Sequence, residues 1–154
     1  MPSAQCLGAN AKCPLPRCLF GTSLAPGKLV PEASDRQTLG KQGELLACEA
    51  LTERGYAILA TRFRTRFGEI DIVAEDGPTL VFVEVKARRS ARCGDAAEAV
   101  SRSKQRRIAA MALDYLAWTG RLEDPCRFDV VAIDGISTNK MTLRVIEDAF
   151  YVDR

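Results

Sequence analysis

Charged residues interrupt two stretches of this chain that otherwise have the composition of buried β-strands. The first stretch, residues 68–73, contains Asp71, and the second, residues 80–86, contains Glu84 and Lys86. Because side chains alternate between the two faces of a strand, Glu84 and Lys86 share one face. A buried carboxylate costs on the order of a few kcal/mol unless it is paired with a cation or bound to a metal ion. Two acids and a lysine that meet on one sheet surface therefore have the pattern of a catalytic metal site.

The first of these strands is predicted to place Glu69 and Asp71 on one face, with Ile70 and Ile72 on the opposite face. Asp71 is the candidate for a metal ligand. Glu69 could instead bind an arginine at the mouth of the strand, so we leave it out of the ligand set.

The carboxylates are suited to hold Mg²⁺ or Mn²⁺, which prefer hard oxygen ligands, and Asp71 and Glu84 are the expected ligands. A bound divalent ion acidifies its water and screens the charge of a phosphodiester. Lys86 points the same way as Glu84 and can orient the attacking water or stabilise charge on the phosphate. Glu44, in a glycine-rich helical stretch, could supply a further carboxylate from across the cleft.

A salt bridge between Glu84 and Lys86 on a solvated strand is the alternative to a metal site. It accounts for that pair, but it does not explain why Glu44, Glu69 and Asp71 should gather around the same place. We therefore favour the metal site.

The chain contains no histidine. This excludes histidine-based triads, HExxH zinc sites and every nuclease design with a histidine base. General-base chemistry must come from carboxylates, lysine or a metal ion with its water.

The charge is distributed unevenly along the chain. The net charge is only +2, but residues 86–107 hold eight basic and two acidic residues, whereas residues 121–154 hold five basic and seven acidic ones. Such asymmetry indicates a side that faces a polyanion. Solvation of a helix face is the alternative for the basic residues that begin the second predicted helix. The residues expected to contact nucleic-acid phosphates are Arg88, Arg89, Lys104 and Arg107.

The length of 154 residues suits one domain with a hydrophobic core. Residues 1–34 contain five prolines and no helical or strand periodicity, and we interpret them as a disordered extension or as the result of a start codon assigned too early. Six cysteines without a CxxC pair favour reduced thiols. Neither a membrane-spanning apolar run nor a secretory signal is visible, so we expect a cytoplasmic location.

Hydrophobic periodicity and turn residues predict the order α-β-β-β-α-β-β, an α/β or α+β domain with a mixed central sheet. The first helix is expected to begin at the N-cap Thr38 and to stop at Gly55. The second is expected to begin near Ala96 and to end at Gly120. The strands are expected near residues 56–64, 68–75, 79–87, 127–133 and 141–146.

Three further predictions concern turns and packing. Asp76-Gly77 indicates a hairpin turn, which Pro78 is expected to lengthen. Asp129 is expected to pair with a basic residue and so brace the sheet. The first helix carries a narrow stripe of small residues that would let it approach a sheet closely, namely Gly40, Gly43 and Ala47.

The spacing of these residues resembles two nested families. Asp71 followed, after a hairpin, by Glu84-Val85-Lys86 is similar to the PD-(D/E)XK signature of restriction-endonuclease-like nucleases. Together with an upstream helical acid it is similar to the Holliday junction resolvases of that superfamily. Over residues 38–150 the chain resembles the small bacterial YraN family. The elements that match in order and spacing are Gly40-x-x-Gly43-Glu44, Gly68-Glu69-Ile70-Asp71, Phe82-Val83-Glu84-Val85-Lys86, Lys104 and Arg127-Phe128-Asp129-Val130.

The resemblance implies a restriction-endonuclease-like fold over residues 35–154. In it Asp71 and Glu84 are metal ligands, Glu44 takes the role of the helix acid, and Lys86 is the catalytic lysine. The chain departs from the family pattern near Arg62, where relatives often carry an asparagine, and at position 87, where a small polar residue is common. Neither departure touches the expected metal ligands.

The resemblance also implies the activity that we expect. This is a Mg²⁺- or Mn²⁺-dependent endonuclease that hydrolyses DNA phosphodiesters, leaves a 5′-phosphate and serves repair or recombination, with branched or damaged DNA as candidate substrates. Dimerisation or a protein partner could define the target. The alternatives are a nucleic-acid-binding module with a vestigial nuclease site, and an adaptor that uses its basic face to bind an acidic protein.

Overall fold

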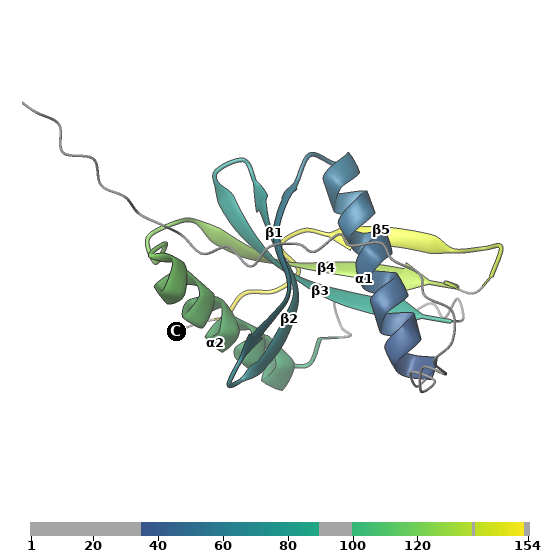
Figure 1. The fold of residues 1–154 in the computed structure, drawn as a ribbon, viewed down its shortest axis with the longest axis horizontal. Helices are drawn as coiled ribbons and strands as arrows, with labels where there is room; N and C mark the ends of the chain where they lie inside the picture. Colours follow the sequence, from purple (N-terminus) through teal and green to yellow (C-terminus); the bar gives the residue numbers. More distant parts are fainter. Residues whose placement is uncertain (1–34, 90–99, 137, 153–154) are drawn as a thin grey trace, which may run out of the picture. The chain divides into compact units, whose positions relative to one another are not determined.

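A five-stranded mixed sheet carries one helix on each of its faces (Figure 1). The computed structural model describes residues 35–89, 100–136 and 138–152, which belong to the compact unit Pro31–Arg154. The extension expected over residues 1–34 and the helix start expected near Ala96 lie outside the described residues. Neither helix of the described ranges has the length and apolar composition needed to cross a membrane.

The elements follow the predicted order α-β-β-β-α-β-β, which is confirmed. In the sheet the strands lie in chain order, β1 to β5. All neighbours pair antiparallel except β3 and β4, which are parallel and are joined by the crossover through α2. The elements are α1 (Asp35–Glu53), β1 (Ala57–Thr65), β2 (Gly68–Asp76), β3 (Thr79–Arg88), α2 (Arg102–Thr119), β4 (Cys126–Asp134) and β5 (Thr142–Ile146).

The ends of the first helix and of the hairpin differ in part from the prediction. Helix α1 begins at Asp35 instead of Thr38, because Arg36 and Gln37 are good helix formers and extend it by most of a turn. The β2–β3 turn is not lengthened by Pro78, since residues 76 and 79 pair directly and leave a two-residue turn.

Helix α2 begins at Arg102 and ends where predicted. Val100 and Ser101 are not helical, and the Ser101 hydroxyl caps the helix by accepting a 3.4 Å hydrogen bond from the Lys104 backbone N–H. At the other end Gly120 adopts a left-handed conformation with φ of 71° and donates its N–H to the last turn.

Two apolar clusters hold the layers together, one on each face of the sheet. Phe82 of β3 belongs to the cluster that α2 covers through Met111, whereas Val83 belongs to the cluster that α1 covers through Leu51. Each such side chain is almost fully buried and contributes about 1.5–3 kcal/mol to folding. The predicted alternation of β3 is therefore confirmed along its buried half.

The alternation of β2 breaks at Asp71. Ile70 packs in the α2-side cluster but Ile72 in the α1-side cluster, although the two are only two residues apart. The expectation that they share a face was wrong. The β2–β3 pairing reaches only to Ile72 and Val83, so β2 leaves β3 at Asp71. This departure opens the space in which the candidate site lies.

Candidate metal and nuclease site

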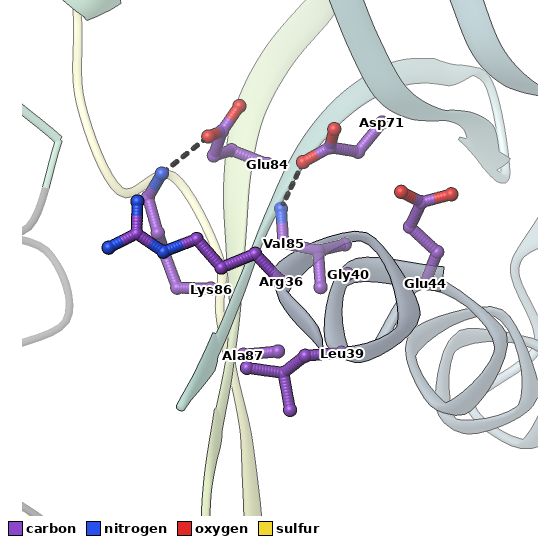
Figure 2. Close-up of a pocket in the computed structure, with 9 residues that line it drawn as sticks. All are labelled: Arg36, Leu39, Gly40, Glu44, Asp71, Glu84, Val85, Lys86 and Ala87. Atoms are coloured by element: carbon purple, nitrogen blue, oxygen red, sulfur yellow. Dashed lines mark hydrogen bonds and ion pairs between the residues drawn. The ribbon is translucent and has the colours of Figure 1, made fainter. Parts of the chain in front are cut away.

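A cavity of about 470 Å³ lies between α1 and the C-terminal half of β3 (Figure 2). Its wall includes all four predicted site residues, which come from three different elements: Glu44 from α1, Asp71 from β2, and Glu84 and Lys86 from β3. The remaining lining residues are Arg36, Leu39, Gly40, Val85 and Ala87.

Close helix packing carries Glu44 to the cavity. A Cβ atom at Gly43 would lie 2.7 Å from Cβ of Ala87, so α1 can approach β3 this closely only with glycine at that position. The next residue on the helix is Glu44. The predicted small-residue stripe is thus confirmed at Gly43 and at the fully buried Ala47. Gly40 has nothing within 4 Å of such a Cβ atom and needs no glycine for packing.

Asp71 is held by the backbone of the neighbouring strand. Its carboxylate accepts a 2.8 Å hydrogen bond from the Val85 backbone N–H, and it makes no ion pair with any side chain in the described part of the chain. Burial, followed by the nearby charge of Glu84, raises the pKa of Asp71 to about 6, against the opposing effects of the Val85 N–H and of Lys104. The position therefore favours a cation that would keep this carboxylate ionised.

Glu84 is buried, at 5% exposure, and both of its oxygens are engaged. Lys86 Nζ lies 2.6 Å from Oε1, and Lys104 Nζ from α2 lies 3.2 Å from Oε2. The salt bridge weighed as an alternative thus exists inside the cavity. The position of Lys104 was not foreseen, since sequence reasoning placed it among the phosphate contacts. Its place in the matching family pattern was the one sequence feature that could have indicated a site role.

Three further carboxylates converge beside this pair. One oxygen from each of Glu44, Glu69 and Asp71 lies within 4.8 Å of the others. Glu69 also forms ion pairs with Arg64 at 2.6 Å and with Arg62 at 3.0 Å, in agreement with the prediction that it binds an arginine. The hydrogen bond from Arg64 lowers the pKa of Glu69. Burial raises the pKa of Glu44, against the effect of Arg62 3.8 Å away.

These residues fit a hard divalent cation. The donors are carboxylate oxygens only, and Asp71 contributes a carboxylate that no side-chain cation of the described residues neutralises by direct contact. Glu44 and Asp71 are thus brought together as predicted. Glu84 lines the same cavity but is satisfied by lysines in the structure.

The predicted phosphate contacts lie in two places. Arg88 is half-buried at the end of β3, and Arg89 follows it at the surface. Arg107 is exposed, and its Nη2 would lie 3.3 Å from a Cβ at Gly68, where β2 begins. The start of β2 does not pair with the end of β3, because the β2–β3 pairing stops at Ile72 and Val83. Lys104 differs from these arginines because it points into the site.

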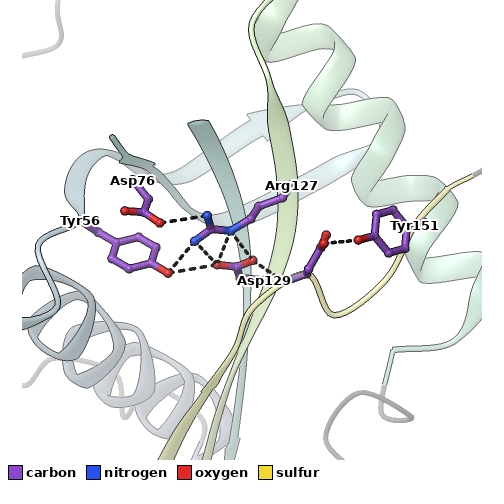
Figure 3. A network of polar contacts seen from close by, with 6 residues as sticks. Tyr56, Asp76, Arg127, Asp129 and Tyr151 are labelled. Atoms are coloured by element: carbon purple, nitrogen blue, oxygen red, sulfur yellow. Dashed lines mark hydrogen bonds and ion pairs between the residues drawn. The ribbon is translucent and has the colours of Figure 1, made fainter. Parts of the chain in front are cut away.

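A separate polar network braces the sheet nearer the β2–β3 turn (Figure 3). Arg127 contacts Asp129 at 3.1 Å, Asp76 at 2.9 Å and the hydroxyl of Tyr56 at 2.7 Å. Asp129 is fully buried and also accepts the Asp148 backbone N–H. Burial raises the pKa of Tyr56 to about 12. The predicted bracing role of Asp129 is confirmed.

The fold and the site together define a class. Restriction-endonuclease-like proteins have this arrangement. Their elements follow the order α-β-β-β-α-β-β around a mixed sheet, with a helix acid, strand acids and a strand lysine around the point where, in this chain, β2 leaves β3.

Comparison with known proteins gives the family. The family described as "Uncharacterised protein family UPF0102" matches residues 43–133. The chain is 49% identical over 113 residues to UPF0102 protein STH1475 of Symbiobacterium thermophilum, covering 73% of this chain and 96% of the relative. It is 45% identical over 119 residues to a UPF0102 protein of Geotalea uraniireducens, covering 77% and 94%. A UPF0102 protein of Rhodococcus jostii is 52% identical over 95 residues, covering 62% and 80%. The chain belongs to the UPF0102 family, which is the YraN family identified from its motifs.

Proposed function

We propose that this protein is a Mg²⁺- or Mn²⁺-dependent nuclease that hydrolyses DNA phosphodiesters. The observation that carries the proposal is the single cavity into which three elements bring Glu44, Asp71, Glu84 and Lys86. Acids that stand this close repel one another unless a cation lies between them. The lysine next to them adds the donor that a developing phosphate charge requires.

The carboxylates of Glu44, Asp71 and Glu84 would hold the metal ion. Glu69 stands close enough to add an oxygen, but its two arginines compete for it. When bound, a divalent ion supplies an acidified water molecule and neutralises phosphate charge.

The protein's own groups orient the reaction. The Val85 N–H fixes the Asp71 carboxylate through a 2.8 Å hydrogen bond, so that carboxylate is positioned before any ligand arrives. Lys86 can donate from Nζ to a water molecule or to a non-bridging phosphate oxygen, because it is anchored on a rigid strand and ends 2.6 Å from Glu84. Arg88 and Arg89 at the end of β3, and Arg107 beside the start of β2, would bind backbone phosphates, which position DNA without reading its sequence.

The biological setting that we propose follows the family resemblance. The substrate would be DNA in repair or recombination, with a second copy or a partner protein helping to define the target. The thiols of Cys48 and Cys126 are free, which supports a reducing, cytoplasmic location.

A cleavage panel tests the proposal. Purified full-length protein is incubated with supercoiled plasmid, single-stranded DNA and a four-way junction, in Mn²⁺ or in EDTA, beside the Asp71→Asn variant. We expect cleavage by the wild type in Mn²⁺ only, and a loss of about a hundredfold or more in the variant, since it removes a metal ligand. If no substrate is cut in Mn²⁺ while the folded protein still binds DNA, the nuclease proposal fails.

One observation favours a second function. Both oxygens of Glu84 are already neutralised by lysines, which is what a nucleic-acid-binding module with a vestigial site would display. Such a module would bind DNA with a strong salt dependence and would be indifferent to Asp71→Asn.

A further inference from the structure

Both oxygens of Glu84 already carry an ammonium contact. Oε1 is 2.6 Å from Lys86 Nζ, and Oε2 is 3.2 Å from Lys104 Nζ. Because each carboxylate oxygen has two lone pairs, a divalent cation that uses this carboxylate must either share an oxygen with an ammonium group, against the repulsion of the two cations, or displace that group. The two contacts differ in length and in the element that supplies the lysine, so they need not give way equally.

We propose that Lys104 is an exchangeable counter-ion of Glu84, which occupies the ligand oxygen in the absence of a divalent cation and leaves it when the cation binds. This inference rests on the proposed function. It gives Lys104 a role in regulating the metal occupancy of the site, which differs from a phosphate contact on a solvated helix face.

The geometry favours Lys104 over Lys86 as the group that leaves. Lys86 stands two residues from Glu84 on the same strand and face, so the pleat itself holds the two side chains together at 2.6 Å. Lys104 reaches Glu84 from a different element over the longer distance of 3.2 Å. The two lysines are about equally exposed, at 31% and 30%, so the difference lies in distance and in the element that supplies each side chain. Lys104 can swing into solvent without moving the sheet.

The position of Lys104 on its helix points the same way. It lies in the first turn of α2, directly after the Ser101 cap, and that turn holds no acidic residue. A cation in the first turn is opposed by the positive end of the helix dipole. What retains the Lys104 ammonium is therefore the charge of Glu84 together with that of nearby Asp71, and neutralisation of these carboxylates by a metal ion weakens that attraction.

The arrangement has a functional consequence. The exchange weakens metal binding, because the incoming ion competes with an internal cation for the same oxygen. It also keeps a buried carboxylate paired while the site holds no metal, which avoids the large penalty of an isolated buried charge. Once displaced, the Lys104 ammonium lies beside the cavity, where it could donate a hydrogen bond to a phosphate oxygen.

Metal titration without nucleic acid tests the inference. Mn²⁺ is titrated calorimetrically into the full chain after EDTA removal, for the wild type, Lys104→Met and Lys104→Gln. Two matched controls accompany them. Arg106→Met removes the same charge from the same helix without a contact to Glu84, and Lys140→Met makes the same substitution at an exposed lysine outside the site.

We expect Lys104→Met to bind Mn²⁺ between about tenfold and a hundredfold more tightly than the wild type, because a unit charge within contact distance of the ligand is lost. Lys104→Gln, which keeps a hydrogen-bond donor, is expected to bind more tightly than the wild type as well. Arg106→Met should change the affinity by about twofold at most, since its charge is exposed and screened. Without metal, Lys104→Met should unfold at a lower temperature than Lys140→Met.

Two results would refute the exchange alone, and a third would refute the metal-dependent function as well. If the wild type binds Mn²⁺ and both Lys104 variants bind it equally or more weakly, the exchange is refuted while the metal site stands. If Arg106→Met tightens Mn²⁺ binding as much as Lys104→Met, the effect comes from the general positive charge of the helix and the exchange is again refuted. If neither the wild type nor any variant binds Mn²⁺, the proposed metal-dependent function itself fails and takes the inference with it. Should Lys104→Met not fold, Lys104→Gln decides.

Discussion

The Val85 backbone N–H donates a 2.8 Å hydrogen bond to the Asp71 carboxylate at the point where β2 and β3 stop pairing. At this point β3 loses its backbone partner in β2, and the Asp71 carboxylate accepts the Val85 N–H instead. This relationship fixes the position of the Asp71 carboxylate before any ligand binds. It also holds that acid in the cavity beside Glu84 and Glu44.

The protonation of Asp71 should govern stability without metal. The folded protein holds its pKa at about 6, above the ordinary value of 3.8. Between these values the folded state binds more protons than the unfolded state, so stability falls as the pH rises through this window. The Asp71→Asn variant in EDTA is expected to gain about 1–3 kcal/mol in free energy of unfolding near pH 7.5, and almost nothing near pH 4. Urea denaturation across this range measures both.

The control for this prediction is Asp114→Asn, at a half-buried position on α2 outside the cavity. It removes a carboxylate without touching the site and should show no such gain. A loss of stability in Asp71→Asn near neutral pH would mean that the charge of Asp71 is stabilising in the metal-free fold, contrary to its burial.

Gly43 should be intolerant of any side chain. A Cβ atom there would stand 2.7 Å from Cβ of Ala87, so Gly43→Ala is expected to destabilise the protein by about 1–3 kcal/mol through overpacking. Gly40→Ala, three residues earlier on the same helix and with nothing within 4 Å, should stabilise it by up to about 1 kcal/mol. Thermal melts of the two variants compare them directly.

A second substitution checks the cause. In Gly43→Ala/Ala87→Gly the clashing methyl group is removed from the strand, and most of the lost stability should return, less the roughly 0.5–1 kcal/mol that glycine costs within a strand. Additive losses in the double variant would show that the contact between helix and strand is not the cause.

Arg62 adopts a left-handed backbone conformation, with φ of 56°, inside β1. Asn tolerates this region and a β-branched residue does not. Arg62→Asn should therefore be more stable than Arg62→Val by about 1–2 kcal/mol. Both variants lose the ion pairs to Glu44 and Glu69. The difference between their free energies of unfolding therefore isolates the effect of the backbone conformation. Equal stability would argue against the left-handed geometry. The asparagine that the YraN pattern often carries near this position fits the same conformation.

The hydroxyl of Tyr56 should matter more than that of Tyr151. Tyr56 is 5% exposed and its hydroxyl receives a 2.7 Å hydrogen bond from Arg127, so Tyr56→Phe is expected to cost about 1–2 kcal/mol. Tyr151 is 76% exposed and bonds Asp148 at the surface, so Tyr151→Phe should change stability by less than about 0.5 kcal/mol. Chemical denaturation of the two variants compares their free energies of unfolding. Equal losses would show that the buried network around Tyr56 does not brace the sheet.

The parts of the fold that depend on local pattern were predictable. The strand β3 runs without interruption, so simple alternation placed Glu84 and Lys86 on the face opposite Val83. Turn residues and periodicity likewise fixed the element order and the end of α2 at Gly120.

What sequence reasoning missed depends on contacts between elements. The break in alternation between Ile70 and Ile72 arises where β2 stops pairing with β3, which no single strand encodes. The contact of Lys104 with Glu84 joins a crossover helix to a strand, and helical periodicity does not say which polar residue reaches inward. The N-cap expected at Thr38 failed because helix propensity before it was sufficient to continue the helix.

In the proposed reaction, the protein hydrolyses DNA in this cavity with a divalent cation and Lys86. The most direct measurement is the single-turnover cleavage rate of a labelled DNA substrate in Mn²⁺ by Lys86→Met and by Lys140→Met, with DNA binding measured for both. We predict that Lys86→Met is about a hundredfold to a thousandfold slower at unchanged DNA affinity, whereas Lys140→Met cleaves like the wild type. Equal cleavage by the two variants, or no cleavage by the wild type, would contradict the account.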